Sequence, residues 1–235
     1  MLDIICDILF PQRCFGCDDY LVPAEEGGVC GRCAATVHPV ESPKCPRCAL
    51  PRELRVGVDD VCRRCLQTPP AFDATHACLL YDGAVRDAIR TAKSADSPSR
   101  LVALVPALLG PFFAAAQPLA DATWTTVPSH PADLRRRGWD PPRTLLGELT
   151  RRSELRLARV ELLEKVTRPP KQARLGRDER EKAPCGAYRA LTRCPRTVVL
   201  FDDVMTTGAT LHHASKALRA AGARTVIAVV AARSV

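Results

Sequence analysis

Four pairs of cysteines, each with two residues between its members, constrain the first third of the chain more than any other feature. The pairs are Cys14/Cys17, Cys30/Cys33, Cys45/Cys48 and Cys62/Cys65. This spacing lets a tight turn direct both thiolates at one metal ion, and two such turns complete a tetrahedral four-cysteine zinc site. Because four protein ligands leave no position for substrate, we expect two structural Zn²⁺ ions rather than a catalytic one.

Spacing alone leaves open how the four pairs combine. Twelve residues separate Cys17 from Cys30 and thirteen separate Cys48 from Cys62, and either interval is long enough for a short hairpin. Sequential pairing would give two zinc ribbons in tandem, whereas a cross-braced pairing would join the first pair with the third. A thioredoxin-like redox pair is disfavoured, since no βαβ pattern surrounds these motifs.

Charge divides the chain into two unlike parts. Residues 1–70 contain eight Lys and Arg against ten Asp and Glu, a net charge of −2, whereas the whole chain carries +8. Thiolates around zinc would make this part more negative still. Since phosphate contacts dominate non-specific nucleic-acid affinity, we expect it to scaffold or to face protein rather than DNA. The predicted domains are a helix and double zinc-ribbon module over 1–70 and a second domain over 71–235.

The start of the chain and its apolar segments bear on the compartment. The first ten residues contain two Asp and neither Lys nor Arg, unlike a secretory signal peptide. The longest apolar run, 101–116, is interrupted by two prolines and a glycine, and it is shorter than the roughly 20 residues of a membrane helix. We expect a cytoplasmic protein without membrane insertion.

After residue 70, short β-branched segments alternate with longer segments of helical spacing. Strands are predicted over 75–81, 123–127, 197–201 and 225–230, and helices over 84–93, 100–116, 142–157 and 210–221. An arginine-rich loop is expected after Pro128 and a basic loop or short helix over 171–184, while 160–166 is ambiguous. The strand, helix and strand from 197 to 230 have the length of a parallel crossover. We therefore expect an α/β fold with a parallel sheet flanked by helices.

One string in this crossover carries the strongest functional signal. Its apolar strand ends in two acids, and a turn of small residues then leads straight into a helix. The residues are Asp202, Asp203, Thr206, Thr207, Gly208, Ala209 and Thr210. Backbone N–H groups of such a turn form an anion cradle. Because carboxylates repel phosphate, we expect sugar hydroxyls to bind the two acids while the phosphate binds the turn. The pattern therefore predicts a ribose 5-phosphate ligand. Neither a GxxxxGK[ST] loop nor a GxGxxG motif is present.

This string resembles the 5-phosphoribosyl 1-pyrophosphate (PRPP) signature of type I phosphoribosyltransferases. With the cysteine pairs ahead of it, the whole chain resembles the ComF family, and the segments 81–83, 127–130, 137–139 and 172–188 resemble further parts of that family. The resemblance implies a phosphoribosyltransferase-like domain that binds PRPP with Mg²⁺ and transfers the phosphoribosyl group, with Asp202 and Asp203 as catalytic residues. It places five residues on the pyrophosphate side: Lys93, Pro128, Ser129, His130 and Arg137.

The resemblance also implies a link to DNA uptake in natural competence, with a helicase or single-stranded DNA as partner. The chain departs from the family pattern at Asp140-Pro141 and at Ala183, where the family has Asn-Gln and Asn, and its Lys-Phe-x-Gly-like segment is reduced to 93–96. These departures fall on the pyrophosphate and acceptor half of the site. The alternative to an enzyme is therefore a non-catalytic PRPP sensor or interaction protein. Cations for a diphosphate are expected among Arg135, Arg137, Lys171, Arg174, Arg177 and Arg180.

Overall fold

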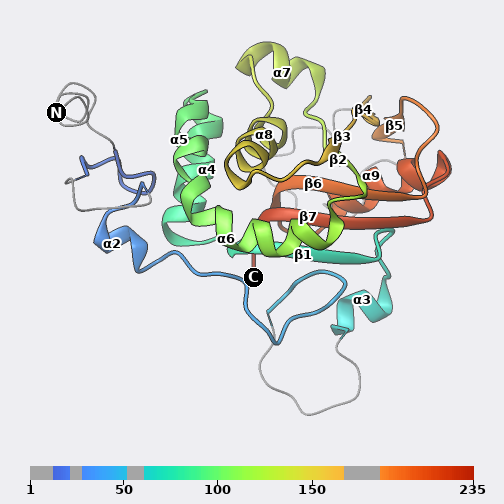
Figure 1. The fold of residues 1–235 in the computed structure, drawn as a ribbon, viewed down its shortest axis with the longest axis horizontal. Helices are drawn as coiled ribbons and strands as arrows, with labels where there is room; N and C mark the ends of the chain where they lie inside the picture. The colour runs from blue at the N-terminus through green and yellow to red at the C-terminus, as the bar shows by residue number, and fades with distance from the viewer. Residues whose placement is uncertain (1–12, 22–27, 52–60, 167–185) are drawn as a thin grey trace, which may run out of the picture.

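A five-stranded parallel sheet forms the centre of the protein (Figure 1). The computed structural model describes residues 13–21, 28–51, 61–166 and 186–235. The strands of the sheet are β1 (Ala74–Leu80), β2 (Thr123–Thr126), β3 (Ala158–Arg159), β6 (Thr197–Met205) and β7 (Thr225–Arg233), in the spatial order β1-β7-β6-β2-β3. A second, antiparallel sheet consists of β4 (Leu163–Lys165) and β5 (Tyr188–Ala190).

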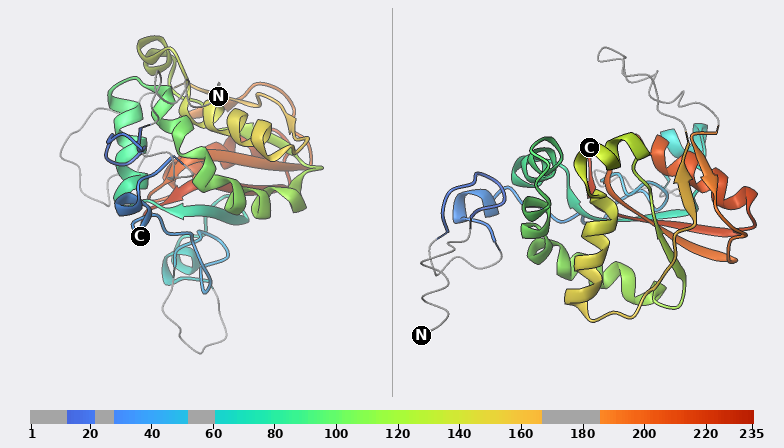
Figure 2. Two further views of the ribbon diagram at one scale, coloured as in Figure 1. Left: turned by 60° about the vertical axis from the view of Figure 1, so that its left-hand side comes forward. Right: turned by 90° about the horizontal axis from the view of Figure 1, so that it is seen from above.

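Helices cover both faces of the main sheet (Figure 2). One face carries α4 (Gly83–Ser94), α5 (Pro98–Ala103), α6 (Val105–Ala116), η1 (Gln117–Leu119) and α8 (Pro141–Ser153). The other carries α9 (Ala209–Ala220) and the small sheet. The remaining helices are α2 (Gly31–Ala34), α3 (Arg63–Gln67) and α7 (Pro131–Arg137). Within the described part of the chain, no helix combines the length and the apolar character that crossing a membrane requires.

Alternation along the central strands produces two hydrophobic cores. In β6, Val199 and Phe201 join the core under α4, α6 and α8, whereas Val198 and Leu200 join the core under α9. Successive side chains of a strand point to opposite faces, so a strand covered on both sides needs apolar residues at every position. This requirement explains why the sequence of β6 reads as one continuous apolar run before its acids.

The two zinc ribbons pack on different parts of the α/β domain. Phe15 of the first ribbon belongs to the core under α4, and Cys45 of the second belongs to the core under α9. Figure 1 shows α2 and α3 on different sides of the sheet. Between the ribbons, the backbone of His38 and Val40 exchanges hydrogen bonds with the edge strand β1. Each ribbon therefore packs separately on the α/β domain, and the segment between them pairs with the sheet.

Comparison with the expected elements confirms the α/β class and shows several local differences. The strand expected over 197–201 continues to Met205, so Asp202 and Asp203 lie within β6, and the helix expected over 142–157 ends at Ser153. The helix expected over 100–116 is broken at Leu104 into α5 and α6, because Pro106 stands in the first turn of α6, where its missing N–H costs nothing. The expected loop after Pro128 was wrong in part: it contains α7, which starts at Pro131 and is capped by His130. The ambiguous segment 160–166 contains β4. The segment 171–184 lies outside the described residues.

Candidate functional site

The eight paired cysteines form two clusters in sequential order. One cluster joins Cys14, Cys17, Cys30 and Cys33, the other joins Cys45, Cys48, Cys62 and Cys65, and the sulfurs of each lie within 4.8 Å of one another. The Sγ atoms of Cys17 and Cys30 are 3.7 Å apart, and those of Cys48 and Cys62 are 3.6 Å apart. A tetrahedron with Zn–S bonds of about 2.3 Å has an edge of about 3.8 Å. The clusters therefore fit two Zn²⁺ ions, and the cross-braced pairing is excluded.

Backbone donors favour the thiolate form that zinc requires. The N–H of Cys30 donates to Sγ of Cys14 at 3.4 Å, and the N–H of Cys62 donates to Sγ of Cys45 at 3.3 Å. Burial raises the pKa of Cys14 and Cys45, but the backbone hydrogen bonds outweigh burial and lower the pKa of each thiol to about 7. Both clusters thus use the same local geometry, as two copies of one ribbon should.

A second candidate site lies where two adjacent parallel strands diverge. The chain leaves β2 through α8, on one face, to reach β3 at the edge. It leaves β6 through α9, on the other face, to reach β7 on the other side. Strands whose connections depart in opposite directions leave a crevice at their carboxyl ends, where open α/β sheets bind ligands. Asp202 and Asp203 of β6 and the segment 127–130 after β2 occupy this end of the sheet.

The two acids of β6 are buried, with 6 % and 4 % of Asp202 and Asp203 exposed. The N–H of Asp203 donates to Oδ1 of Asp202 at 2.9 Å, and Nζ of Lys93 lies 2.6 Å from Oδ2 of Asp203. Burial and the charge of Asp203 raise the pKa of Asp202 well above its usual range, against the opposing charge of Lys93. Burial alone would lower the pKa of Lys93, but Asp203 outweighs burial and raises it. Lys93 alone does not balance two buried carboxylates. A proton, a further cation or the hydroxyl groups of a ligand would stabilise the pair.

The turn from β6 into α9 presents open backbone donors. Gly208 precedes α9 with φ at +80°, and Oγ1 of Thr207 accepts the N–H of Ala209 at 3.3 Å. Among the described residues, no hydrogen bond uses the N–H groups of Thr207 or Gly208. Thr206 and Thr210 are exposed beside them. Open N–H groups at the N-terminus of a twelve-residue helix attract an anion.

Alanine at Gly208 is expected to strain this turn. The φ of +80° lies in the left-handed region, and the added Cβ would lie 2.7 Å from Cε of Met205. We expect Gly208→Ala to lower the free energy of unfolding, measured by urea denaturation, by about 1–2 kcal/mol. Gly110→Ala in α6 is the matched control, because its added Cβ meets no atom within 4 Å. Equal losses in the two variants would contradict a strained turn.

The residues assigned to the pyrophosphate side lie in three places: in α4, in the segment after β2 and at the end of α7. Lys93 reaches the acid pair, as described above. After β2, the chain continues through Pro128, and the N–H of Ser129 donates to Oδ2 of Asp140 at 2.9 Å. Nδ1 of His130 accepts the N–H of Ala132 at 3.1 Å and so caps α7. Their contact with a ligand stays a prediction.

Arg137 lies at the end of α7 and is largely buried. Its Nε is 3.7 Å from Oδ1 of Asp96, which follows α4, and its guanidinium lies over the ring of Trp139 at 5.6 Å. Arg136 also pairs with Asp96, at 3.2 Å. These contacts tie α7 to the end of the helix that carries Lys93, so the arginine-rich segment borders the crevice. The candidates Lys171, Arg174, Arg177 and Arg180 lie outside the described residues.

Two further residues belong to the crevice: Asp140, which the sequence marked only as a departure from the family pattern, and Tyr188, to which it assigned no role. Burial raises the pKa of Asp140, and within the described chain its Oδ1 has no hydrogen-bond partner. Burial raises the pKa of Tyr188 as well, and the charges of Asp202 and Asp140 add to this shift. The electrostatic influence of Asp202 and Asp140 on one phenol places all three side chains in one neighbourhood. No sequence signal pointed to Tyr188 beyond its position after the basic segment.

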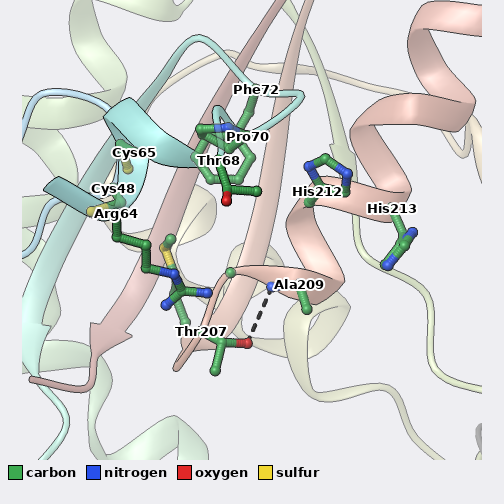
Figure 3. Close-up of a pocket in the computed structure, with 12 residues that line it drawn as sticks. Cys48, Arg64, Cys65, Thr68, Pro70, Phe72, Thr207, Ala209, His212 and His213 are labelled. Atoms are coloured by element: carbon green, nitrogen blue, oxygen red, sulfur yellow. Dashed lines mark hydrogen bonds between the residues drawn. The ribbon is translucent and has the colours of Figure 1, made fainter. Parts of the chain in front are cut away.

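A pocket of about 110 Å³ lies between the second zinc ribbon and the turn (Figure 3). Arg64 of α3 lines it from the ribbon, and Figure 3 shows its side chain extending toward Thr207. His212 and His213 of α9 line it from the other side. Nδ1 of His212 accepts the N–H of Ala71 at 3.1 Å, so its neutral ring carries the proton on Nε2. The pocket therefore has Arg64 on the ribbon side and two imidazole side chains on the side of α9.

Comparison with known proteins bears on the first part of the chain. Residues 5–66 match the family model of the double zinc ribbon domain, and the match contains all eight ligands of the two clusters. No curated protein matches the chain significantly. The chain therefore begins with a double zinc ribbon, which is followed by an α/β domain with a mostly parallel sheet.

Proposed function

We propose that the α/β domain binds the ribose 5-phosphate part of PRPP and transfers the phosphoribosyl group to a nitrogen acceptor. The observation that carries the proposal is the pair of buried acids, Asp202 and Asp203, placed near the end of β6 and two residues before a turn with open N–H groups at the crevice of the sheet. The N–H groups of the turn suit a phosphate, whereas the acids suit hydroxyl groups. Few ligands other than a phosphorylated sugar combine both.

The proposed reaction exchanges one bond at the anomeric carbon. The C1–O bond to diphosphate breaks, and diphosphate leaves with the electron pair. The nitrogen lone pair forms the C1–N bond, and the nitrogen then gives up its proton to solvent water. Asp202 and Asp203 hold the ribose hydroxyls and favour the positive charge that develops at C1, while Lys93 offers a cation toward the diphosphate. Mg²⁺, held by the ligand together with these hard carboxylate oxygens, would supply further positive charge for the leaving group.

A non-catalytic sensor of PRPP is the second candidate, and Asp140 favours it. This acid is held by the N–H of Ser129 in the loop after β2, on the half of the site assigned to diphosphate. A carboxylate there opposes the negative charge of a leaving diphosphate. Binding through the turn and the acid pair would persist without turnover. The link to DNA uptake, with a helicase or single-stranded DNA as partner, belongs to either version of the proposal.

Isothermal titration tests the binding step. Ribose 5-phosphate and Mg²⁺-PRPP are expected to bind the wild type, and Asp203→Asn is expected to weaken both by about 10- to 100-fold, because hydrogen bonds to charged groups contribute about 1.5–3 kcal/mol. Asp87→Asn is the control, since Asp87 is an exposed acid of α4 paired with Arg86. The absence of binding to the wild type, or equal binding by Asp203→Asn, would contradict the proposal.

Diphosphate release separates the enzyme from the sensor. Incubation of Mg²⁺-PRPP with a panel of nitrogen acceptors should release diphosphate at a rate above the spontaneous one if the protein is a transferase. Binding without release for every acceptor would favour the sensor. DNA affinity, measured over a range of salt concentrations, would show whether the basic α/β domain also contacts phosphates of nucleic acid.

A further inference from the structure

A buried arginine at the end of β7 joins the second zinc ribbon to the turn. Arg233 is only 3 % exposed. Its Nε donates to the carbonyl oxygen of Cys48, a member of the second cluster, at 2.9 Å. Its Nη1 donates to the carbonyl oxygen of Thr206 at 2.8 Å and to that of Met205 at 3.3 Å. One guanidinium thus bonds both the zinc ribbon and the first peptide units of the turn.

These hydrogen bonds fix the orientation of the turn's donors. Within a planar trans peptide unit, the carbonyl and the N–H point in opposite directions. Arg233 holds the carbonyls of Met205 and Thr206, so the N–H groups of Thr206 and Thr207 must face away from the guanidinium. The second of these is one of the open donors described above. Arg233 therefore orients groups that a phosphate would meet, without reaching the phosphate itself.

The second ribbon also contacts the turn along another path. Arg64 lies between the ligands Cys62 and Cys65 and shares a pocket with Thr207 (Figure 3). Phe72, just after the ribbon, lies 3.7 Å from the point where a Cβ on Gly208 would be placed. The first cluster packs elsewhere, against α4, where Gly16 approaches Ala84. Only one of the two zinc sites in the described chain is thus joined to the turn by such contacts.

We propose that zinc at the second four-cysteine cluster positions the phosphate-binding turn, with Arg233 as the positioning residue, so that zinc and the phosphorylated ligand strengthen each other's binding. This inference rests on the proposed function. Zinc holds Cys48 and thereby its carbonyl, Arg233 carries that constraint to Met205 and Thr206, and the turn is held ready for the ligand. Coupling between two sites is reciprocal. If bound zinc raises the affinity for the ligand by some factor, the bound ligand must raise the affinity for zinc by the same factor.

Equilibrium competition for zinc with a chelating dye measures this coupling. The step that Cys17→Ser removes from the wild-type titration curve belongs to the first cluster, and the remaining step belongs to the second. Saturating ribose 5-phosphate is expected to raise the zinc affinity of the second cluster by about 5-fold or more, the lower end of typical coupling between sites. The zinc affinity of the first cluster is expected to stay unchanged.

Arg233→Lys tests the path of the coupling. Lysine keeps the positive charge but lacks the planar fork that reaches the carbonyls of Cys48, Met205 and Thr206 together. We expect this variant to keep both zinc ions, to bind ribose 5-phosphate more weakly and to lose the ligand's effect on zinc affinity. Arg219→Lys is the matched control, because Arg219 holds Asp73 and the carbonyls of Ala71 and Arg224 rather than the turn.

The outcomes separate this inference from the proposed function. If the wild type binds ribose 5-phosphate but the zinc affinity of the second cluster is unchanged, or the affinities of both clusters rise equally, the inference is wrong and the function stands. If the wild type binds neither ribose 5-phosphate nor Mg²⁺-PRPP, the proposed function is wrong and the inference falls with it. Should Arg233→Lys fail to fold, the zinc measurement on the wild type with and without ribose 5-phosphate still tests whether the two sites are coupled.

Discussion

Serine in place of Cys45 is expected to leave the chain largely unfolded, whereas serine in place of Cys17 is expected to leave the sheet intact. Cys45 is fully buried and belongs to the same core as Leu200 of β6 and Val226 of β7. Structural zinc contributes an apparent binding free energy of about 10–16 kcal/mol, and the net stability of a domain is only about 5–15 kcal/mol. Loss of the second zinc therefore removes a support comparable with the whole stability of the domain.

Cys17 differs from Cys45 in its surroundings rather than in its chemistry. It is half-buried, and the cluster to which it belongs has one buried member, Cys14, against three in the second cluster. Circular dichroism, size-exclusion chromatography and metal analysis check the prediction together. The wild type should contain two zinc ions per chain and Cys17→Ser one, with a cooperative melting transition retained. Equal loss of structure in the two variants, or fewer than two zinc ions in the wild type, would contradict it.

Asparagine in place of Asp202 is expected to stabilise the protein while it weakens ligand binding. Burial and the neighbouring Asp203 raise the pKa of Asp202, so ionisation of Asp202 costs more in the folded chain than in the unfolded one. Asparagine keeps the oxygen that accepts the N–H of Asp203 and carries no charge. We expect a gain on the order of 1–2 kcal/mol in the free energy of unfolding at neutral pH, in line with other substitutions that relax a functional site.

The pH dependence follows from the direction of the shift. Because the pKa of Asp202 is higher in the folded state, its contribution to stability is fully present below the unfolded pKa and is lost as pH rises through the folded pKa. An uncharged asparagine at this position would avoid that loss, so the advantage of Asp202→Asn should grow as pH rises. Urea denaturation across the neutral range with zinc present measures it, with Asp87→Asn as the control. An advantage that shrinks as pH rises, or unimpaired binding of ribose 5-phosphate, would contradict the prediction.

Local sequence signals predicted the parts of the fold that local chemistry controls. The two-residue spacing within each cysteine pair predicts zinc ligation because it lets one tight turn direct both thiolates at the same ion. The continuous apolar run of β6 predicts a strand buried on both faces. The order of acids, small residues and helix predicts an anion-binding turn, since all of its parts are contiguous. The α/β class and the two four-cysteine sites are confirmed, whereas PRPP binding stays a prediction.

The structure decided what depends on residues far apart in the chain. Sequential pairing of the clusters depends on how each hairpin folds back, which spacing alone leaves open. The ion pair of Lys93 with Asp203 joins α4 to β6 across more than a hundred residues. Arg233 looks like a surface charge at the end of an apolar strand, yet it is buried and bonded to Cys48 and Thr206. Sequence therefore determined the two four-cysteine zinc sites and predicted an anion-binding turn, because the residues of each lie close together in the chain. Only tertiary packing placed them in contact, because a buried guanidinium requires carbonyl partners that distant segments supply.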